Sequence, residues 1–322
     1  MRKRSTTLLV VSVLFVTASL IVSTITNALY KAMPSAYAET NAAMLSTTTL
    51  TANDSGFASN LTRNTNTTAA TTATNEGLQI NKDLKYFDSS SGYLVYPSTR
   101  ATTAINTTTN TTAAVAKKIP ALIMIHEFWG INDNIRSMAN TIAKQAGYAV
   151  LAVDLFKGQS TKDPNQAMQL VKLARSNPQE AISNLQAAVQ YVSSLPFVDS
   201  SKIASIGWCF GGGQSLQLAL HSEQHPLAAT VLYYGTPLVT NTQELSKIKW
   251  PVLGIFGDQD KAIPIEQIQQ FKAALDAGGI INQIQIYKGL GHAFANPSGP
   301  NYAPKETADA WQKTLEFLKK YV

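Results

Sequence analysis

The sequence predicts an α/β fold in which helices cover both faces of a mostly parallel sheet. Short apolar runs of strand length alternate with segments whose apolar residues recur at helical spacing. These runs are apolar on both sides, which is typical of strands buried between two layers of helices. Apolar residues make up 45% of the 322 residues, so the chain can build a large core. Functional groups in such sheets gather at the carboxyl ends of the strands.

The strand pattern begins near Leu78 with two short segments, 84–87 and 93–96, that predict a hairpin around Ser-Ser-Gly. The apolar runs that follow predict strands at 121–125, 149–153, 203–206, 228–233, 252–256 and 283–287.

Apolar stripes and start signals predict the helices between these strands. Ile135, Met138 and Ile142 share one face of a helix over 132–145. Asn177-Pro178 is a cap followed by a first helical residue. The other predicted helices cover 214–221, 264–275 and 305–318.

The first 38 residues have the features of a secretory signal. A basic start, MRKR, is followed by an apolar run from Leu8 to Val22 and by A-Y-A ending at Ala38. Cleavage after Ala38 is expected. An uncleaved signal anchor is the alternative, because the run can be extended toward Leu29 and then approaches the length of a membrane span. We therefore expect an extracellular or cell-surface protein, held at a membrane only if this segment is retained.

Two stretches rich in Thr, Asn, Ala and Ser, residues 39–77 and about 99–116, contain few large apolar side chains. Such segments bury too little surface to offset the entropy of ordering them. We therefore expect a linker at 39–77 and an insertion at 99–116 within a folded domain at 78–322. Both stretches contain N-x-S/T sequons, which arise by chance in such compositions but are candidate glycosylation sites in an exported protein. These sequons start at Asn53, Asn60, Asn66, Asn106 and Asn110.

The net charge of +6 comes largely from the N-terminus. Of the 26 basic residues, four lie in residues 1–38, which leaves 22 against 20 acidic residues after cleavage. A nearly neutral protein gives no electrostatic reason to expect a nucleic-acid partner.

Cys209 is the only cysteine, and it lies in a G-W-C-F-G motif that follows the expected strand 203–206. G-x-C-x-G at a strand-to-helix turn has the form of a nucleophile elbow, which usually carries Ser at its centre. The glycines permit the close packing of such a strained turn, and the helix N-terminus favours a thiolate. The backbone N–H of Phe210 can then serve as an oxyanion donor. The alternative is a buried structural cysteine.

A thiol nucleophile needs a base, and the base needs a carboxylate that orients it. Two carboxylates, Asp258 and Asp260, follow the strand 252–256. We favour Asp260 because it fits a G-x-x-D-x-x-x-P pattern, whereas Asp258 suits a turn or cap. His292 lies in G-L-G-H-A-F after the last strand and completes the order nucleophile, acid, base.

These motifs, in this order, resemble those of the dienelactone hydrolase family. The segments H-E-F-W-G (126–130), D-L-F (154–156), G-W-C-F-G-G-G (207–213), G-D-Q-D-K-A-I-P (257–264) and G-H-A-F (291–294) carry the likeness over about residues 78–322. The resemblance implies an α/β-hydrolase fold and hydrolysis of a small ester or lactone. It also implies that Glu127 contacts the resting thiol and that the N–H of Phe128 is the second oxyanion donor.

A carboxylate beside a thiol disfavours the charged form of each, so the pair implied by the family would keep the resting thiol neutral and protected from oxidation. The sequence departs from the family at Asn296, where well-known dienelactone hydrolases carry an Arg for the substrate carboxylate. Arg175 is the nearest basic candidate, and dienelactone itself is not implied as the substrate.

The sequence thus predicts an exported hydrolase with a Cys-Asp-His triad that needs no cofactor and no metal. A catalytically silent surface protein that binds a ligand through the same fold is the alternative. A thiol redox protein is disfavoured because Cys209 has no second cysteine to resolve it.

Overall fold

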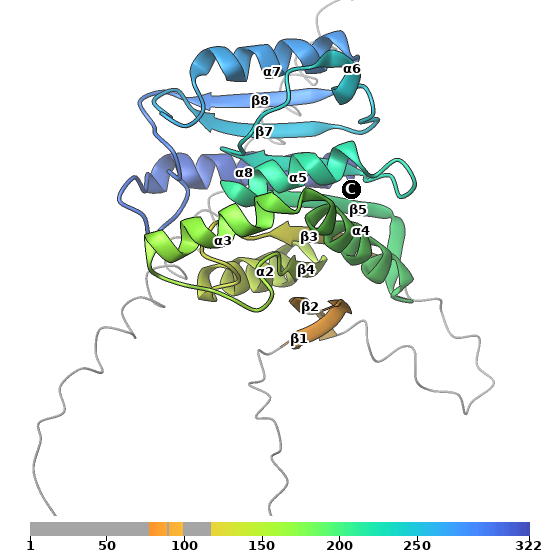
Figure 1. The fold of residues 1–322 in the computed structure, drawn as a ribbon. Coiled ribbons are helices and arrows are strands. Elements are labelled where there is room, and N and C mark those ends of the chain that lie inside the picture. The colour runs from red at the N-terminus through yellow and green to blue at the C-terminus, as the bar shows by residue number, and fades with distance from the viewer. Residues whose placement is uncertain (1–76, 89, 99–116) are drawn as a thin grey trace, which may run out of the picture. The chain divides into compact units, whose positions relative to one another are not determined.

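The structure is a computed structural model, and it describes residues 77–88, 90–98 and 117–322 (Figure 1). The predicted signal segment 1–38, the sequons and the insertion 99–116 lie outside the described residues, as does the predicted linker up to residue 76. The strands are β1 (Leu78–Phe87), β2 (Ser90–Pro97), β3 (Ile119–Ile125), β4 (Ala149–Val153), β5 (Val198–Trp208), β6 (Ala229–Tyr233), β7 (Val252–Gly257) and β8 (Asn282–Tyr287). The helices are α2 (Asp133–Ala146), α3 (Pro164–Ser176), α4 (Pro178–Ser194), α5 (Phe210–Leu220), α6 (Thr242–Leu245), α7 (Ile265–Ala277) and α8 (Pro304–Tyr321).

The described strands form one eight-stranded sheet in the order β1-β2-β4-β3-β5-β6-β7-β8. The hairpin β1–β2 is antiparallel and joins β4 in antiparallel pairing, while β4, β3 and β5 to β8 run parallel. Every residue of β4, β6 and β7 is buried, as the apolar runs indicated. The predicted fold class, an α/β-hydrolase fold, is confirmed.

The strand order reverses direction next to β3. The first parallel crossover leads from β3 outward to β4, and the next returns across β3 to β5. Because such crossovers are right-handed, the two connections leave opposite faces of the sheet. The loops that follow β3 and β5 therefore diverge, and the crevice between them is where ligands bind in open α/β sheets.

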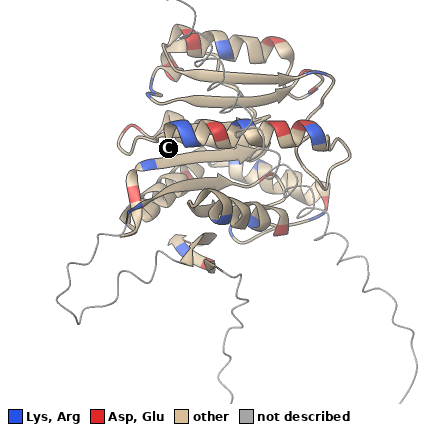
Figure 2. Cartoon of the chain, turned by 180° about the vertical axis from the view of Figure 1, so that it is seen from behind, with Lys and Arg blue, Asp and Glu red and all other residues tan. Residues whose placement is uncertain are grey.

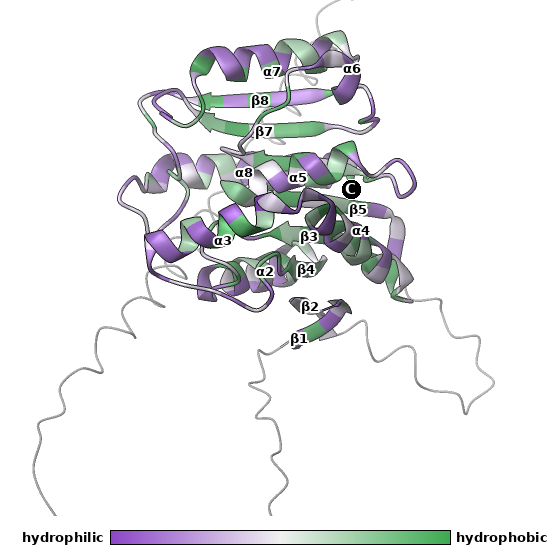
Figure 3. Ribbon diagram, viewed as in Figure 1, coloured by the Kyte–Doolittle hydropathy of each residue, from purple (hydrophilic) through white to green (hydrophobic). Residues whose placement is uncertain are grey.

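Helices cover both faces of the sheet. In Figure 1, α4 and α5 lie in front of it and α7 is seen above β8, whereas α8 lies behind and is seen in front in Figure 2. The predicted start signal is present, because Asn177 caps α4 by accepting from the N–H of Glu180. Asn132 caps α2 in the same way and accepts from the N–H of Ile135 at 3.0 Å. Figure 3 shows helices that are green on one side and purple on the other, next to green strands.

Some boundaries differ from the prediction. Strand β5 begins at Val198 and α5 begins at Phe210, because the glycines of the elbow belong to the first helical turn. The short helix α6 was not predicted. Strand β8 is only half-buried, because it lies at the edge of the sheet.

Charged side chains are interspersed on helices and loops, with both signs on α8 (Figure 2). Within residues 77–88, 90–98 and 117–322, no helix combines the length and the apolar character that crossing a bilayer requires.

Candidate active site

Cys209 lies in a sharp turn between β5 and α5. Its backbone has φ 54° and ψ −117°, a conformation that residues with a side chain adopt rarely and that is typical of a strained functional position. Its N–H donates to the carbonyl of Tyr233 at 3.0 Å, and its own carbonyl accepts from Gly213. The side chain is half-buried rather than enclosed in the core.

Two glycines make this turn possible. A Cβ on Gly207 would lie 2.1 Å from the carbonyl oxygen of Gly211. A Cβ on Gly211 would lie 2.3 Å from the carbonyl oxygen of Ile125, at the end of β3. The first turn of α5 is therefore pressed against β5 and β3, which fixes the position of Cys209 at the carboxyl edge of the sheet.

The structure brings Cys209, His292 and Asp260 together. The Nε2 atom of His292 lies 3.1 Å from the Sγ atom of Cys209. Its Nδ1 atom lies 2.7 Å from the Oδ2 atom of Asp260, whose side chain is almost fully buried. Asp260 also accepts from the N–H of Ala262, which fixes the carboxylate. The three side chains come from loops after β5, β7 and β8, and they form a continuous chain of contacts.

The environment of His292 favours its charged form. Burial lowers the pKa of His292, but hydrogen bonds to Asp260 and Cys209, together with the negative charges of both, raise it to about 10. A protonated imidazole at this position can stabilise a thiolate and later deliver its proton to a leaving group.

Asp258 and His126 have surroundings that differ from those of Asp260 and His292. Asp258 accepts from the N–H of Gly289 at 2.6 Å and thus holds the loop before His292, which agrees with the turn role predicted for it. His126 is fully buried, with Nε2 accepting from Leu155 and Nδ1 beside the carbonyl of Glu127. Burial lowers the pKa of His126, so the ring stays neutral and joins the loop after β3 to the end of β4.

Glu127 is buried beside the site, with 4% of its surface exposed. Its Oε2 atom accepts from the amide of Asn296 at 2.8 Å. Burial raises the pKa of Glu127 to about 7, although the positive charge of His292 lowers it in part. Among the described residues, Glu127 forms this hydrogen bond with the amide of Asn296, whereas Sγ of Cys209 is paired with His292. This arrangement differs from the resting thiol contact that the family resemblance implied.

The two predicted oxyanion donors lie on either side of the crevice. Phe210 is the first residue of α5, so its N–H belongs to the positive end of that helix. Phe128 is half-buried in the loop after β3, and its ring packs against the tilted ring of Trp129, with 4.1 Å between centroids. Both residues follow strands that flank the switch point of the sheet.

Asn296 and Arg175, the two positions considered for binding a substrate carboxylate, form hydrogen bonds within the protein. Asn296 directs its amide to Glu127, and its oxygen accepts from the N–H of Ser298. Arg175, near the end of α3, donates to the carbonyl of Thr236 at 3.1 Å, next to the loop that follows β6. No group of three or more His, Cys, Asp or Glu in the described part of the chain is arranged to hold a metal ion.

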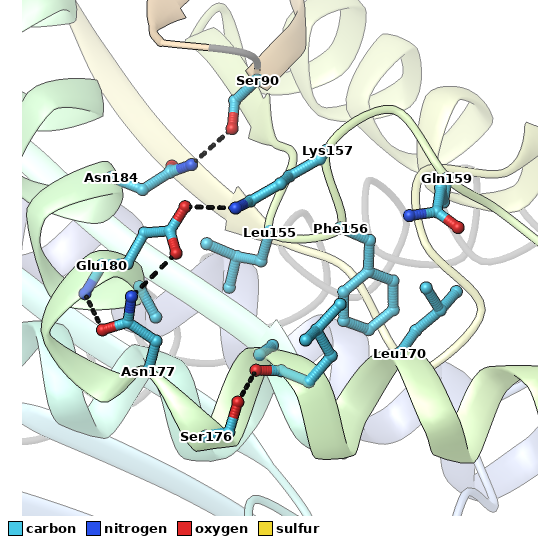
Figure 4. A pocket seen from close by; sticks show the side chains of 13 residues that line it. Ser90, Leu155, Phe156, Lys157, Gln159, Leu170, Ser176, Asn177, Glu180 and Asn184 are labelled. Atoms are coloured by element: carbon cyan, nitrogen blue, oxygen red, sulfur yellow. Dashed lines mark hydrogen bonds and ion pairs between the residues drawn. The ribbon is translucent and has the colours of Figure 1, made fainter.

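A cavity of about 290 Å³ lies between α3, α4 and the loop after β4. Figure 4 shows the side chains of Lys157 and Glu180 pointing toward one another, with Leu155 below them in this view; their ion pair measures 2.6 Å. Phe156 also lines this cavity, and its ring lies 5.3 Å from that of Phe210. Cys209, His292 and Asp260 do not line this cavity, and Phe156 is the lining residue that contacts Phe210.

Sequence reasoning missed two groups of residues. Asn184 on α4 accepts from Tyr86 and donates to Ser90 and to the carbonyl of Asp154, a buried network that joins the hairpin to the sheet. Tyr234, directly after β6, is fully buried beside His292 with a ring distance of 5.1 Å. Its position at the carboxyl edge of the sheet was the signal that could have identified it.

Comparison with known proteins agrees with this geometry. The profile of the Dienelactone hydrolase family matches residues 105–322, which is more than half of the chain. The protein belongs to the dienelactone hydrolase family. As a member of that family it is a hydrolase that acts on a small molecule.

Curated relatives of this dienelactone hydrolase family member include two proteins that share one name. A candidate carboxymethylenebutenolidase of Saccharolobus solfataricus is 30% identical over 246 residues, covering 62% of this chain and 89% of the relative. A protein of the same name from Aquifex aeolicus is 26% identical over 208 residues, covering 63% of this chain and 89% of the relative.

Solved structures share the fold. A candidate dienelactone hydrolase from Klebsiella pneumoniae aligns with a TM-score of 0.60 at 23% identity, covering 76% of this chain and 98% of the other. A dienelactone hydrolase-like promiscuous phosphotriesterase from metagenomic libraries aligns with a TM-score of 0.65 at 21% identity, covering 76% and 99%. At these identities the likeness supports the α/β-hydrolase fold of the family.

Proposed function

We propose that this protein hydrolyses a small carboxylic ester or lactone through a Cys-Asp-His triad and an acyl-enzyme. The observation that carries the proposal is the pair of contacts made by His292, 3.1 Å to Sγ of Cys209 and 2.7 Å to Oδ2 of Asp260. A half-buried thiol on a strained turn, with an oriented imidazole beside it, is the geometry that nucleophilic acyl transfer requires.

In the first step, the Cys209 thiolate, paired with protonated His292, attacks the carbonyl carbon. A carbon–sulfur bond forms as the π bond of the carbonyl group breaks. The negative charge on the former carbonyl oxygen is stabilised by the N–H groups of Phe210 and Phe128. The bond to the leaving oxygen then breaks, and that oxygen takes the proton from Nε2 of His292. With a lactone, the new hydroxyl stays attached to the acyl group.

In the second step, His292 removes a proton from water, which attacks the thioester. The carbon–sulfur bond breaks, the acid leaves and the imidazolium–thiolate pair is restored. Asp260 holds the imidazole in one tautomer and stabilises its charged form through both steps. No cofactor or metal takes part in this scheme.

Glu127 supports the proposal as a second buried acid–base group, which interacts electrostatically with His292. Because its pKa is about 7, Glu127 exists near neutral pH both as carboxylic acid and as carboxylate. A group of this kind can hold or accept the thiol proton before substrate binds. This role rests on its position beside the triad and on its burial.

We also propose that the protein is exported, with residues 1–38 as a signal peptide or anchor. The basic start, apolar run and A-Y-A ending support it. Intact mass measurement of the protein secreted by a host cell tests this, with an N-terminus at Glu39 and added glycan mass expected. A full-length, unmodified chain in the cytosol would contradict it.

Ester hydrolysis is tested with p-nitrophenyl acetate and a panel of simple lactones. Replacing Cys209 by Ala should lower kcat by about 10³-fold or more, and iodoacetamide should inactivate the wild type to a similar extent. His292→Ala should act similarly, whereas the matched variant His225→Ala, at an exposed position, should keep the wild-type rate. Unchanged turnover in Cys209→Ala would refute the proposal.

A further inference from the structure

Tyr234 is held in an unfavourable backbone conformation next to the site. It directly follows β6 and has φ 38°, in the left-handed region that side chains disfavour. Its N–H donates to the carbonyl of Ile255 at 2.7 Å. The next residue, Gly235, packs so closely on α5 that a Cβ there would lie 2.5 Å from the carbonyl carbon of Gly212. Strain of this kind often marks a position with a functional constraint.

The side chain of Tyr234 is fully buried, yet its hydroxyl proton has no hydrogen-bond acceptor among the described residues. The ring packs against His292 at 5.1 Å and against Phe294 at 5.7 Å between centroids. The backbone N–H of Ala295 lies near enough to the hydroxyl oxygen to lower the pKa of Tyr234 in part, but an N–H cannot accept the hydroxyl proton. Buried hydroxyl groups nearly always have a hydrogen-bond partner, so we expect the Tyr234 hydroxyl to donate to an acceptor nearby.

The acidic side chains that interact electrostatically with this hydroxyl include Glu127 and Cys209. Burial raises the pKa of Tyr234 well above 10, and the charges of Glu127, then Cys209, then Tyr233 raise it further. Asn296 follows Ala295 directly and donates to Glu127, so one short segment contacts both the tyrosine and the carboxyl group. The buried tyrosine hydroxyl, the buried Glu127 carboxyl and the half-buried Cys209 thiol therefore interact electrostatically.

Tyr233, the last residue of β6, differs from Tyr234 in the pairing of its hydroxyl. The hydroxyl of Tyr233 pairs with Oγ1 of Thr314 on α8 at 2.7 Å. Two consecutive tyrosines are therefore buried, one with a paired hydroxyl and one without, and they serve as a matched pair in an experiment.

We propose that the Tyr234 hydroxyl is a positioning donor that hydrogen-bonds to the ionised carboxylate of Glu127, beside the Cys209 thiol. The inference rests on the proposed function of that thiol. When the carboxylate takes the thiol proton, the S–H bond breaks, an O–H bond forms and the negative charge moves to sulfur. Tyr234 keeps its own proton throughout and turns its O–H toward the group that carries the charge.

A hydrogen bond to the charged form lowers the pKa of a carboxyl group, and its loss raises the pKa. Removing the Tyr234 hydroxyl should therefore shift the ionisation of Glu127 upward by about one pH unit, the size expected for a hydrogen bond to a charged group. The other titratable neighbours are His292 with Asp260, and His126, whose lowered pKa leaves it neutral near pH 7.

The test is the rate of alkylation of Cys209 by iodoacetamide between pH 5 and pH 9, without substrate. Because the chain has one cysteine, the rate reports on this thiol alone. The wild type should show an inflection near pH 7 that Glu127→Gln removes. Tyr234→Phe should move that inflection upward, and the matched Tyr233→Phe should leave it in place.

Phe at position 234 keeps the ring contacts, and circular dichroism establishes that each variant is folded. In the Glu127→Gln background, Tyr234→Phe should have no further effect on the profile. An unmoved inflection in Tyr234→Phe, or a shift that persists without Glu127, would overturn the inference. Loss of the proposed function would instead appear as unchanged ester turnover in Cys209→Ala, so the two failures are distinguishable.

Discussion

Replacing Glu127 by Gln should make the stability of the fold less sensitive to rising pH. Burial raises the pKa of Glu127 from the ordinary value of 4.5 to about 7 in the folded state. Between these values the folded protein holds a proton that the unfolded chain has released. The contribution of Glu127 to stability is therefore complete below about pH 4.5 and is lost as the pH rises through about 7.

The size of the effect follows from the same two values. The interval from 4.5 to about 7, at about 1.4 kcal/mol per pH unit, corresponds to a total loss of about 3 kcal/mol. Roughly 2–3 kcal/mol of this falls between pH 5 and pH 8. Gln is neutral at every pH and can still accept the hydrogen bond from the amide of Asn296. The stability of the Glu127→Gln variant should therefore not show this loss.

Urea denaturation of the wild type and of Glu127→Gln at pH 5, 6, 7 and 8 measures the difference. The variant should gain about 2–3 kcal/mol relative to the wild type between pH 5 and pH 8. Glu223→Gln, the same change at an exposed position, should follow the wild type. The burial argument is wrong if the difference between wild type and Glu127→Gln varies by less than about 0.5 kcal/mol across this range.

Two further changes test the orientation of the base and the packing of the elbow. Asp260→Asn should lower the pKa of His292, because the carboxylate that raises this pKa is lost. The variant should also reduce kcat/KM for p-nitrophenyl acetate by about 10²-fold or more. Asp258→Asn should reduce kcat/KM much less, because Asp258 holds the loop before His292 and not the imidazole. Gly211→Ala should lower the free energy of unfolding by about 3 kcal/mol or more, because the added Cβ would lie 2.3 Å from a backbone oxygen of β3. Gly279→Ala, where a Cβ meets no neighbour, should cost only the strain of its positive φ, about 1–2 kcal/mol.

Equal losses of kcat/KM in the two aspartate variants would contradict the assignment of the acid. Equal losses of stability in the two glycine variants would contradict the close packing of the elbow.

The fold was predictable because its signals are local. Each buried strand is a short apolar run, and caps such as Asn132 and Asn177 accept hydrogen bonds from N–H groups three residues away. The boundaries of β5 and α5 were predicted less accurately. The glycines after Cys209 belong to the helix because they pack against β3 and β5, and the local sequence does not specify these contacts.

The main members of the candidate site were predictable for a similar reason. Cys209, Asp260 and His292 each follow an apolar strand directly, and the strand ends meet at one edge of the sheet. The partners of Glu127 were not predictable. The contact with Asn296 joins residues 169 positions apart, and it depends on side-chain directions that no spacing in the sequence specifies.

The most direct test of Cys209 as nucleophile is to trap the acyl-enzyme. The wild type is mixed with p-nitrophenyl acetate, quenched with acid before the first turnover is complete, and digested for peptide mass spectrometry. One acetyl group should be found on the peptide that contains Cys209, and it should be absent after pretreatment with iodoacetamide. Rapid ester turnover with an unmodified Cys209 peptide, or with the acetyl group on another residue, would contradict the proposed mechanism.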